Sequence, residues 1–160
     1  MFEATLTGDW KKTKRTIQLL PTFTKVLNEK LLTAVSERFY QALIAHFREQ
    51  DLALEPLSKW YSQWKTKRGL DGRILIATGQ MVGEIRIHEN GDEKFVGIKG
   101  GKRHQSGIDI ALLALVHEYG SVARGIPARP VYRLTVAELR RELETIVQAV
   151  IDETAVEVFG

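Results

Sequence analysis

The longest regular pattern in the sequence is an apolar stripe, and it restricts the chain to folds that contain a long helix. Apolar side chains recur every three or four residues, at Phe23, Val26, Leu27, Leu31, Val35, Phe39, Leu43 and Phe47. This spacing places them on one face of an α-helix over residues 22–50. Thr22, directly after Pro21, is the predicted N-cap. Ahead of it, residues 1–21 form a basic N-terminal segment, in which a shorter helix is predicted over residues 10–20.

A second long helix is predicted near the C-terminus, over residues 131–156. Pro130 suits its first turn, and the apolar stripe continues at Val136, Leu139, Leu143, Ile146, Val150 and Val156. Between the two long helices, the apolar run at residues 109–119 ends at Gly120. Its length favours a buried helix with a glycine C-cap, a central strand being the alternative.

The region 73–99 has the pattern of a β-hairpin. Ile85 and Ile87 alternate with polar residues before Asn90-Gly91, and a second strand-like run follows at residues 94–98. Asn-Gly between alternating segments is a strong hairpin signal, because both central positions of such a turn need a positive φ.

The next stretch, residues 97–107, holds four glycines and three basic residues and is predicted to be a mobile basic loop. Together these patterns predict a single domain over residues 1–160. Its class is α+β, with two long amphipathic helices packed on a small antiparallel β-sheet that contains the Asn-Gly hairpin.

The composition excludes several kinds of chemistry. The 160 residues include no cysteine, so disulfides, thiol catalysis and cysteine-ligated zinc are all excluded. No stretch approaches the roughly 18 consecutive apolar residues that a membrane span needs, so no membrane partner is expected.

Charge is distributed unevenly along the chain. Residues 56–108 hold ten Lys and Arg against five Asp and Glu, whereas residues 137–160 hold two Arg against six Asp and Glu. Solvated faces are the simpler explanation, but the polarity also suits docking of the basic middle segment against the acidic C-terminal helix of a neighbouring copy. The candidate docking residues are Trp60, Trp64, Lys65, Lys67, Arg68, Lys99, Lys102 and Arg103. The alternative is a nucleic-acid-binding accessory protein whose segment 59–73 and loop 97–107 face phosphates.

The stretch VHEYGSVARGIPARPVY, residues 116–132, looks like a reactive site, but its spacing fits none. A zinc protease needs a second histidine one helical turn after His117, where this chain has Ser121. The other histidines share no ligand spacing with it: His46, His88 and His104. The chain also lacks a nucleophile elbow and a phosphate loop. We therefore expect no catalytic residue, no metal and no cofactor.

The same stretch is predicted to be a structural joint or interface. Ile126-Pro127-Ala128-Arg129-Pro130 forces an extended path, because each proline fixes its own φ and restricts the residue before it. Such a link holds the preceding glycine turn and the last helix in a fixed relation. Arg129 can then present its planar fork to a carboxylate or to carbonyls. The joint residues are His117, Glu118, Tyr119, Gly120, Ile126, Pro127, Arg129 and Pro130.

Several motifs in order resemble one protein family. After the N-terminal amphipathic helix come Ile74-Leu75-Ile76-Ala77-Thr78-Gly79, then Glu84-Ile85-Arg86-Ile87 and the hairpin. Ala114-Leu115-Val116-His117-Glu118-Tyr119-Gly120 follows, and then residues 126–130 and the last helix. Over residues 22–150 this order is similar to that of the head–tail connection proteins of tailed bacteriophages and prophages, also called virion-morphogenesis, tail-completion or neck proteins.

The resemblance implies a structural virion protein that completes the tail or the connector so that head and tail can join. It implies a homo-oligomeric ring, with six copies as the expected number, in contact with neighbouring neck, connector or tail-tube and terminator proteins. DNA would pass through such a ring without sequence-specific binding. The implied location is the neck or tail end of the virion, assembled in the host cytoplasm.

Overall fold

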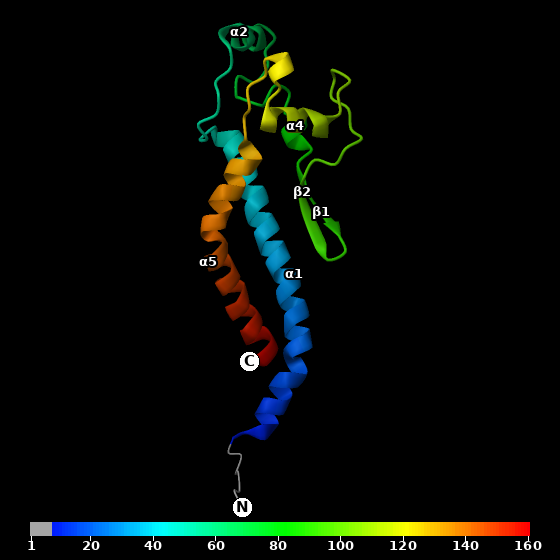
Figure 1. Ribbon diagram of the computed structural model, residues 1–160, viewed down its shortest axis with the longest axis vertical. Coiled ribbons are helices and arrows are strands. Elements are labelled where there is room, and N and C mark those ends of the chain that lie inside the picture. Colours follow the sequence, from blue (N-terminus) through cyan, green and yellow to red (C-terminus); the bar gives the residue numbers. More distant parts are fainter. Residues whose placement is uncertain (1–7) are drawn as a thin grey trace, which may run out of the picture.

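Two long helices dominate the computed structural model, which describes residues 8–160 (Figure 1). Helices α1 (Trp10–Glu49) and α5 (Val131–Phe159) lie side by side, and the other elements gather at one end of the pair, which we call the head. The head holds α2 (Lys59–Lys67), α3 (Gln80–Gly83), β1 (Arg86–Asn90), β2 (Glu93–Gly97), α4 (Ile110–Tyr119) and the 3-10 turn η1 (Val122–Arg124). The predicted α+β class, with long helices and a small antiparallel sheet, is confirmed.

Helix α1 is longer than predicted, because the segments 10–20 and 22–50 form one continuous helix. Its N-cap is Asp9, whose carboxylate accepts the Lys12 N–H at 3.0 Å, so the assignment of Thr22 as N-cap is wrong. Pro21 lies inside the helix at an exposed position. A proline ring has a helical φ but removes one backbone hydrogen bond. The helix continues beyond it, and the ring of Phe23 packs on that of Phe159 of α5, with 5.1 Å between the ring centroids.

Ion pairs join α5 to α1 along much of their length. Lys30 binds both Glu153 and Glu157 at 2.6 Å, and Arg38 binds Glu142 at 2.8 Å. Nearer the head, the His46 ring lies 2.9 Å from the carboxylate of Glu138. Four of the six acidic side chains of residues 137–160 are therefore used within the chain, which weakens the expectation that this helix offers its charge to a neighbour.

The sheet consists of one β-hairpin, packed on α1. Asn90 pairs with Glu93 at the end of the ladder, so Gly91 and Asp92 are the central residues of the turn. The turn is thus centred one residue later than the Asn-Gly pair predicted. Of the residues at this turn, Gly91 has a positive φ, +59°, while Asn90 keeps a strand conformation.

The apolar core lies in the head, where the long helices meet the smaller elements. Leu43, Ile85 and Ile110 are fully buried at its centre, and Phe47 and Val131 complete it from α1 and α5. Toward the far end the helix pair is more exposed, and Val156 of α5 is largely in solvent. None of the helices within residues 8–160 is both long and apolar enough to cross a membrane.

Because Leu43 lies at the centre of this core, we expect Leu43→Ala to lower the free energy of unfolding by about 2–5 kcal/mol. The matched control is Leu134→Ala, at a position of α5 that is 40% exposed. Urea denaturation of both variants measures the difference. Equal losses in the two variants would show that the core is not centred at Leu43.

Candidate functional site

The predicted joint lies in the head, where α4 ends and α5 begins. Its central contact is the buried carboxylate of Glu118, which accepts hydrogen bonds from the backbone N–H groups of Tyr132 at 3.0 Å and Arg133 at 2.9 Å. These are N–H groups of the first turn of α5, which have no partner within the helix. Pro130, at the N-cap of α5, has no side chain that can serve them. A carboxylate from α4 therefore caps α5, and its negative charge also suits the helix dipole.

Arg129 attaches the joint to the loop between α1 and α2. Its Nε donates to the carbonyl of Glu55 at 2.8 Å and its Nη2 to that of Pro56 at 3.1 Å, so its fork meets carbonyls, one of the two predicted alternatives. Its backbone N–H also donates to the carbonyl of His117 at 2.7 Å. The side chain is buried, and burial lowers the pKa of Arg129, although Glu55 opposes that shift. This residue therefore links α4, the segment 120–130 between α4 and α5, which we call the connector, and the α1–α2 loop.

Gly120 permits the connector to pass close to the end of α4. Its φ is +75°, and a Cβ there would lie 2.8 Å from the Ala128 nitrogen and 2.9 Å from the Ile126 carbonyl oxygen. Both the backbone angle and the close approach exclude a side chain. Ser121 and Ile126 then pair through two backbone hydrogen bonds and close the small loop around η1.

The remaining joint residues are divided between the surface and the interior. The Tyr119 ring points outward and carries the Arg133 guanidinium at 4.8 Å from its centre. Pro127 is exposed. Together with Ile126 and His117 it lines a pocket. The structure thus brings all eight predicted joint residues into one region around the start of α5.

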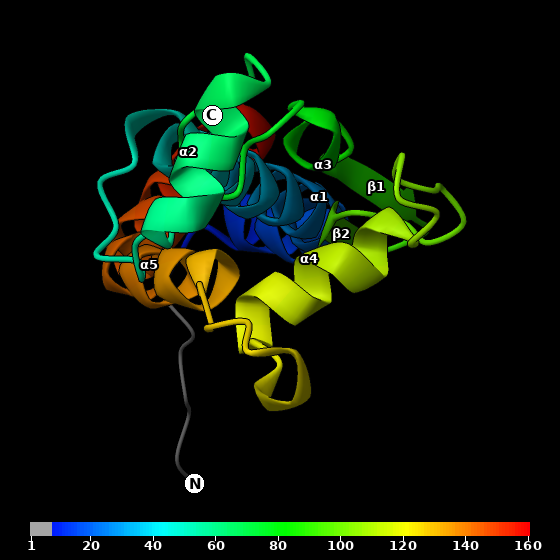
Figure 2. The ribbon, with the colours of Figure 1, turned by 90° about the horizontal axis from the view of Figure 1, so that it is seen from above.

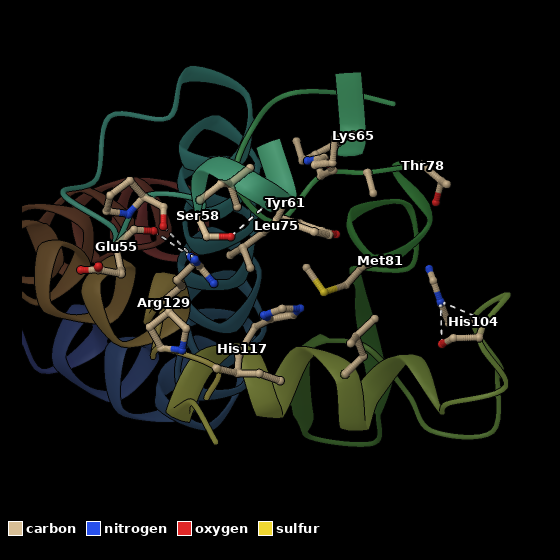
Figure 3. Close-up of a pocket in the computed structure, with 18 of the residues that line it drawn as sticks. Glu55, Ser58, Tyr61, Lys65, Leu75, Thr78, Met81, His104, His117 and Arg129 are labelled. Atoms are coloured by element: carbon tan, nitrogen blue, oxygen red, sulfur yellow. Dashed lines mark hydrogen bonds between the residues drawn. The ribbon is translucent and has the colours of Figure 1, made fainter. Parts of the chain in front are cut away.

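That pocket has a volume of about 710 Å³ and lies between α2, α3, α4 and the connector (Figure 3). Its apolar walls include Leu75, Met81 and Leu113. Its polar side chains include His117 and Arg129 on one side and Tyr61 of α2 on another, as Figure 3 shows. The sequence patterns gave no sign of this hollow, because its walls come from five separate segments.

His117 is the side chain in this pocket with the strongest features of a functional group. Burial, with a smaller effect from the charge of Arg129, lowers its pKa from the ordinary value of 6.5. Its Nδ1 atom is buried and has no hydrogen-bond partner within residues 8–160. Within that part of the chain, no three His, Asp or Glu side chains are grouped as metal ligands.

Lys65 was predicted to be a docking residue, and that prediction is wrong. Its side chain is 1% exposed and donates to the carbonyls of Arg73, at 2.7 Å, and Ile76. Burial lowers the pKa of Lys65, while Asp71 acts in the opposite direction. The ammonium group holds the loop that follows α2 and is unavailable to a partner.

The other basic docking candidates are exposed but divided between two places. Lys67 on α2 and Arg68 directly after it are exposed. Trp60 is 71% exposed, and the Arg68 guanidinium lies over the Trp64 ring, 4.4 Å from its centre. Lys99, Lys102 and Arg103 are exposed on loop 97–107. Figure 2 shows α2 and this loop at different sides of the head.

Loop 97–107 has a defined hydrogen-bonded path. The Asp109 carboxylate accepts the Gly101 N–H at 2.6 Å, the His104 N–H donates to Ile108 at 2.8 Å, and Lys102 pairs with Glu84 at 2.5 Å. The predicted mobility of this loop stays a prediction.

An exposed apolar surface on α4 and the hairpin is the feature that the sequence analysis missed. Helix α4 was predicted to be buried, but only one face of it is. Leu112 and Leu115 are 51% and 54% exposed on the other face. We define the α4 patch as Leu112, Leu115 and Tyr119, which share one face of α4, together with Phe95, which lines a hollow with Leu115 and Tyr119; all four are exposed. Beside it, a shallow hollow of about 270 Å³ lies between α4 and β2.

The chain is similar to a known protein of unassigned function. The chain is 29% identical over 109 residues to an uncharacterized protein of Methanocaldococcus jannaschii, a match that covers 66% of this chain and 73% of the other. No family profile matches the chain, and no solved structure matches it.

We expect Gly120→Ala to destabilise the protein more than Gly125→Ala does. Gly125 also has a positive φ, +62°, but its side chain would enter open space. Gly125→Ala therefore costs about 1–2 kcal/mol for the left-handed backbone alone. Gly120→Ala adds the clash with the connector, and urea denaturation measures both. Equal losses would contradict the close packing of the joint.

We expect His117 to make stability depend on pH. Since its folded pKa lies below its unfolded value of about 6.5, the unfolded chain takes up a proton first as the pH falls. The stability that neutral His117 contributes is therefore complete above that pH and is lost as the pH falls through it. The free energy of unfolding of His117→Gln, which cannot titrate, should rise relative to that of the wild type as the pH falls from about 7.5 to about 5.5. A constant difference between the two proteins would contradict the lowered pKa.

Proposed function

We propose that the chain is a structural subunit of the neck or tail end of a tailed bacteriophage, which completes the tail or connector so that head and tail can join. The α4 patch carries the proposal. A monomeric protein rarely exposes a contiguous group of large apolar side chains, and such groups usually mark an interaction surface. Two leucines of the most apolar helix in the chain lie in this patch, beside a hollow that can take a side chain.

The joint supports the same role. The proposed family motif, HEYG followed by IPARP, consists here of residues that hold α4, the connector and α5 at a fixed angle through Glu118, Gly120 and Arg129. No reactive group is needed to explain their presence. A rigid subunit with one apolar face suits assembly into a homo-oligomeric ring, in which each copy needs two unlike surfaces.

This assignment replaces the charge pairing expected from the sequence. Lys65 is buried, and Glu138, Glu142, Glu153 and Glu157 already pair with α1. We propose instead that the α4 patch contacts the neighbouring copy. The further partners proposed are neck, connector or tail-tube and terminator proteins, with DNA passing through the ring without sequence-specific binding. The proposed location is the virion, assembled in the host cytoplasm.

We expect the double substitution Leu112→Glu with Leu115→Glu to prevent ring formation while leaving the fold intact, since both side chains are exposed. The control is Val156→Glu, an apolar position that is 73% exposed at the far end of α5. Sedimentation velocity and negative-stain electron microscopy measure assembly, and circular dichroism confirms folding.

Rings that persist in the double variant would exclude the α4 patch as the contact. A wild-type monomer whose binding to DNA falls steeply with salt would favour the alternative function, a nucleic-acid-binding accessory protein that uses segment 59–73 and loop 97–107.

A further inference from the structure

The pocket beneath α2 is lined by two buried positive charges that form no ion pair with a carboxylate within residues 8–160. Lys65 and Arg129 both line it, are 1% and 7% exposed, and donate only to backbone carbonyls. Buried charges in proteins are usually paired with an opposite charge. Among the described residues, the acidic one that lines the pocket is Glu55, which is exposed and acts on Arg129 without pairing with it. A bound anion could therefore pair with these charges.

Two further polar atoms in this pocket lack partners. The Nδ1 atom of His117 and the Oε1 atom of Gln80 are both buried and make no hydrogen bond within residues 8–160. Arg129 donates through Nε and Nη2, and its Nη1 group, which is not one of these buried atoms, is left for a ligand. Buried polar atoms are nearly always satisfied, so unpartnered atoms that line one cavity indicate a ligand that supplies the missing partners.

The rest of the lining is apolar and aromatic. Leu75, Met81, Leu113, Ile126 and the ring of Tyr61 surround the space in which these polar groups lie (Figure 3). A cavity of about 710 Å³ with mostly apolar walls and a few polar groups has the size and character of a small-ligand site.

We propose that this pocket binds an apolar acyl-amino acid group, meaning a carboxylate and an N–H donor carried on an apolar side chain. The carboxylate would accept hydrogen bonds from the Nη1 group of Arg129 and from His117, whose imidazole donates through Nδ1 in the appropriate tautomer. The N–H would donate to the Oε1 atom of Gln80, and the apolar side chain would contact Leu75 and Met81. This chemistry is shared by the C-terminal residue of a peptide chain and by a free N-acyl amino acid.

The inference does not depend on the proposed virion role. The α4 patch and this pocket use different faces of α4, since Leu113 and His117 line the pocket whereas Leu112 and Leu115 form the patch.

The test uses two pairs of probes and the full chain. N-acetyl-leucine and its neutral amide, N-acetyl-leucinamide, form the first pair. The tripeptide N-acetyl-Gly-Gly-Leu, as free acid and as C-terminal amide, forms the second. Isothermal titration calorimetry measures affinity, and amide chemical shifts locate binding. We expect the acids to bind and the amides to bind at least about tenfold more weakly, since hydrogen bonds to charged groups are the stronger ones.

Two variants probe the site, and one serves as a control. His117→Leu and Gln80→Leu each remove one unpartnered atom while keeping an apolar wall, so both should weaken binding of the acids with little loss of stability. Gln63→Leu, at an exposed position of α2 outside the pocket, should leave binding unchanged.

The outcomes are distinct. Tighter binding of the tripeptide acid identifies a protein C-terminus as the ligand source, and equal binding of the two acids identifies a free amino-acid derivative. Equal binding of acids and amides, unchanged binding by both site variants, or no binding of either acid to the wild-type protein would overturn the proposal.

Discussion

The contact between Glu118 and the first turn of α5 is the interaction on which the rest of the head depends. A buried carboxylate is stable only where donors satisfy it, and here the donors are two backbone N–H groups of another helix and the Nε of Arg133. The contact therefore fixes the direction of α5 relative to α4 while it satisfies both partners. The carboxylate and the buried site also raise the pKa of the neighbouring Tyr132 hydroxyl to about 12, with burial the larger cause. Gly120 and Arg129 complete the same arrangement from the connector.

This arrangement gives the two faces of α4 different roles. One face closes the core through Ile110 and lines the pocket through Leu113 and His117. The opposite face exposes Leu112 and Leu115. Because Glu118 and Arg129 hold α4 in place from its C-terminal end, a partner on the outer face would meet a surface that is already in its final shape. The proposed subunit contact and the proposed ligand site are thus supported by one set of hydrogen bonds.

The parts of the fold that follow from local periodicity were predictable from the sequence. The stripe around Leu43, the helix that begins at Val131 and the cap at Gly120 all lie where the patterns placed them. Burial of Lys65 was not predictable, because it depends on carbonyls of a loop whose path is set by the whole head. The α4 patch could not be predicted from the sequence for a different reason. An apolar run indicates that a surface is covered, but it does not reveal whether the same chain or another copy covers it.

The unequal distribution of the core along the α1–α5 pair has a mechanical consequence. Near Leu43 the pair is anchored in the head. Its far end is joined by the Phe23–Phe159 contact and by ion pairs between Lys30 and the exposed carboxylates of Glu153 and Glu157. Exposed ion pairs are weak and are screened by salt. Salt is therefore expected to weaken the contact between the distal turns of α1 and α5 more than the packing of the head. The distal ends of α1 and α5 then respond to ionic strength, while the head stays rigid.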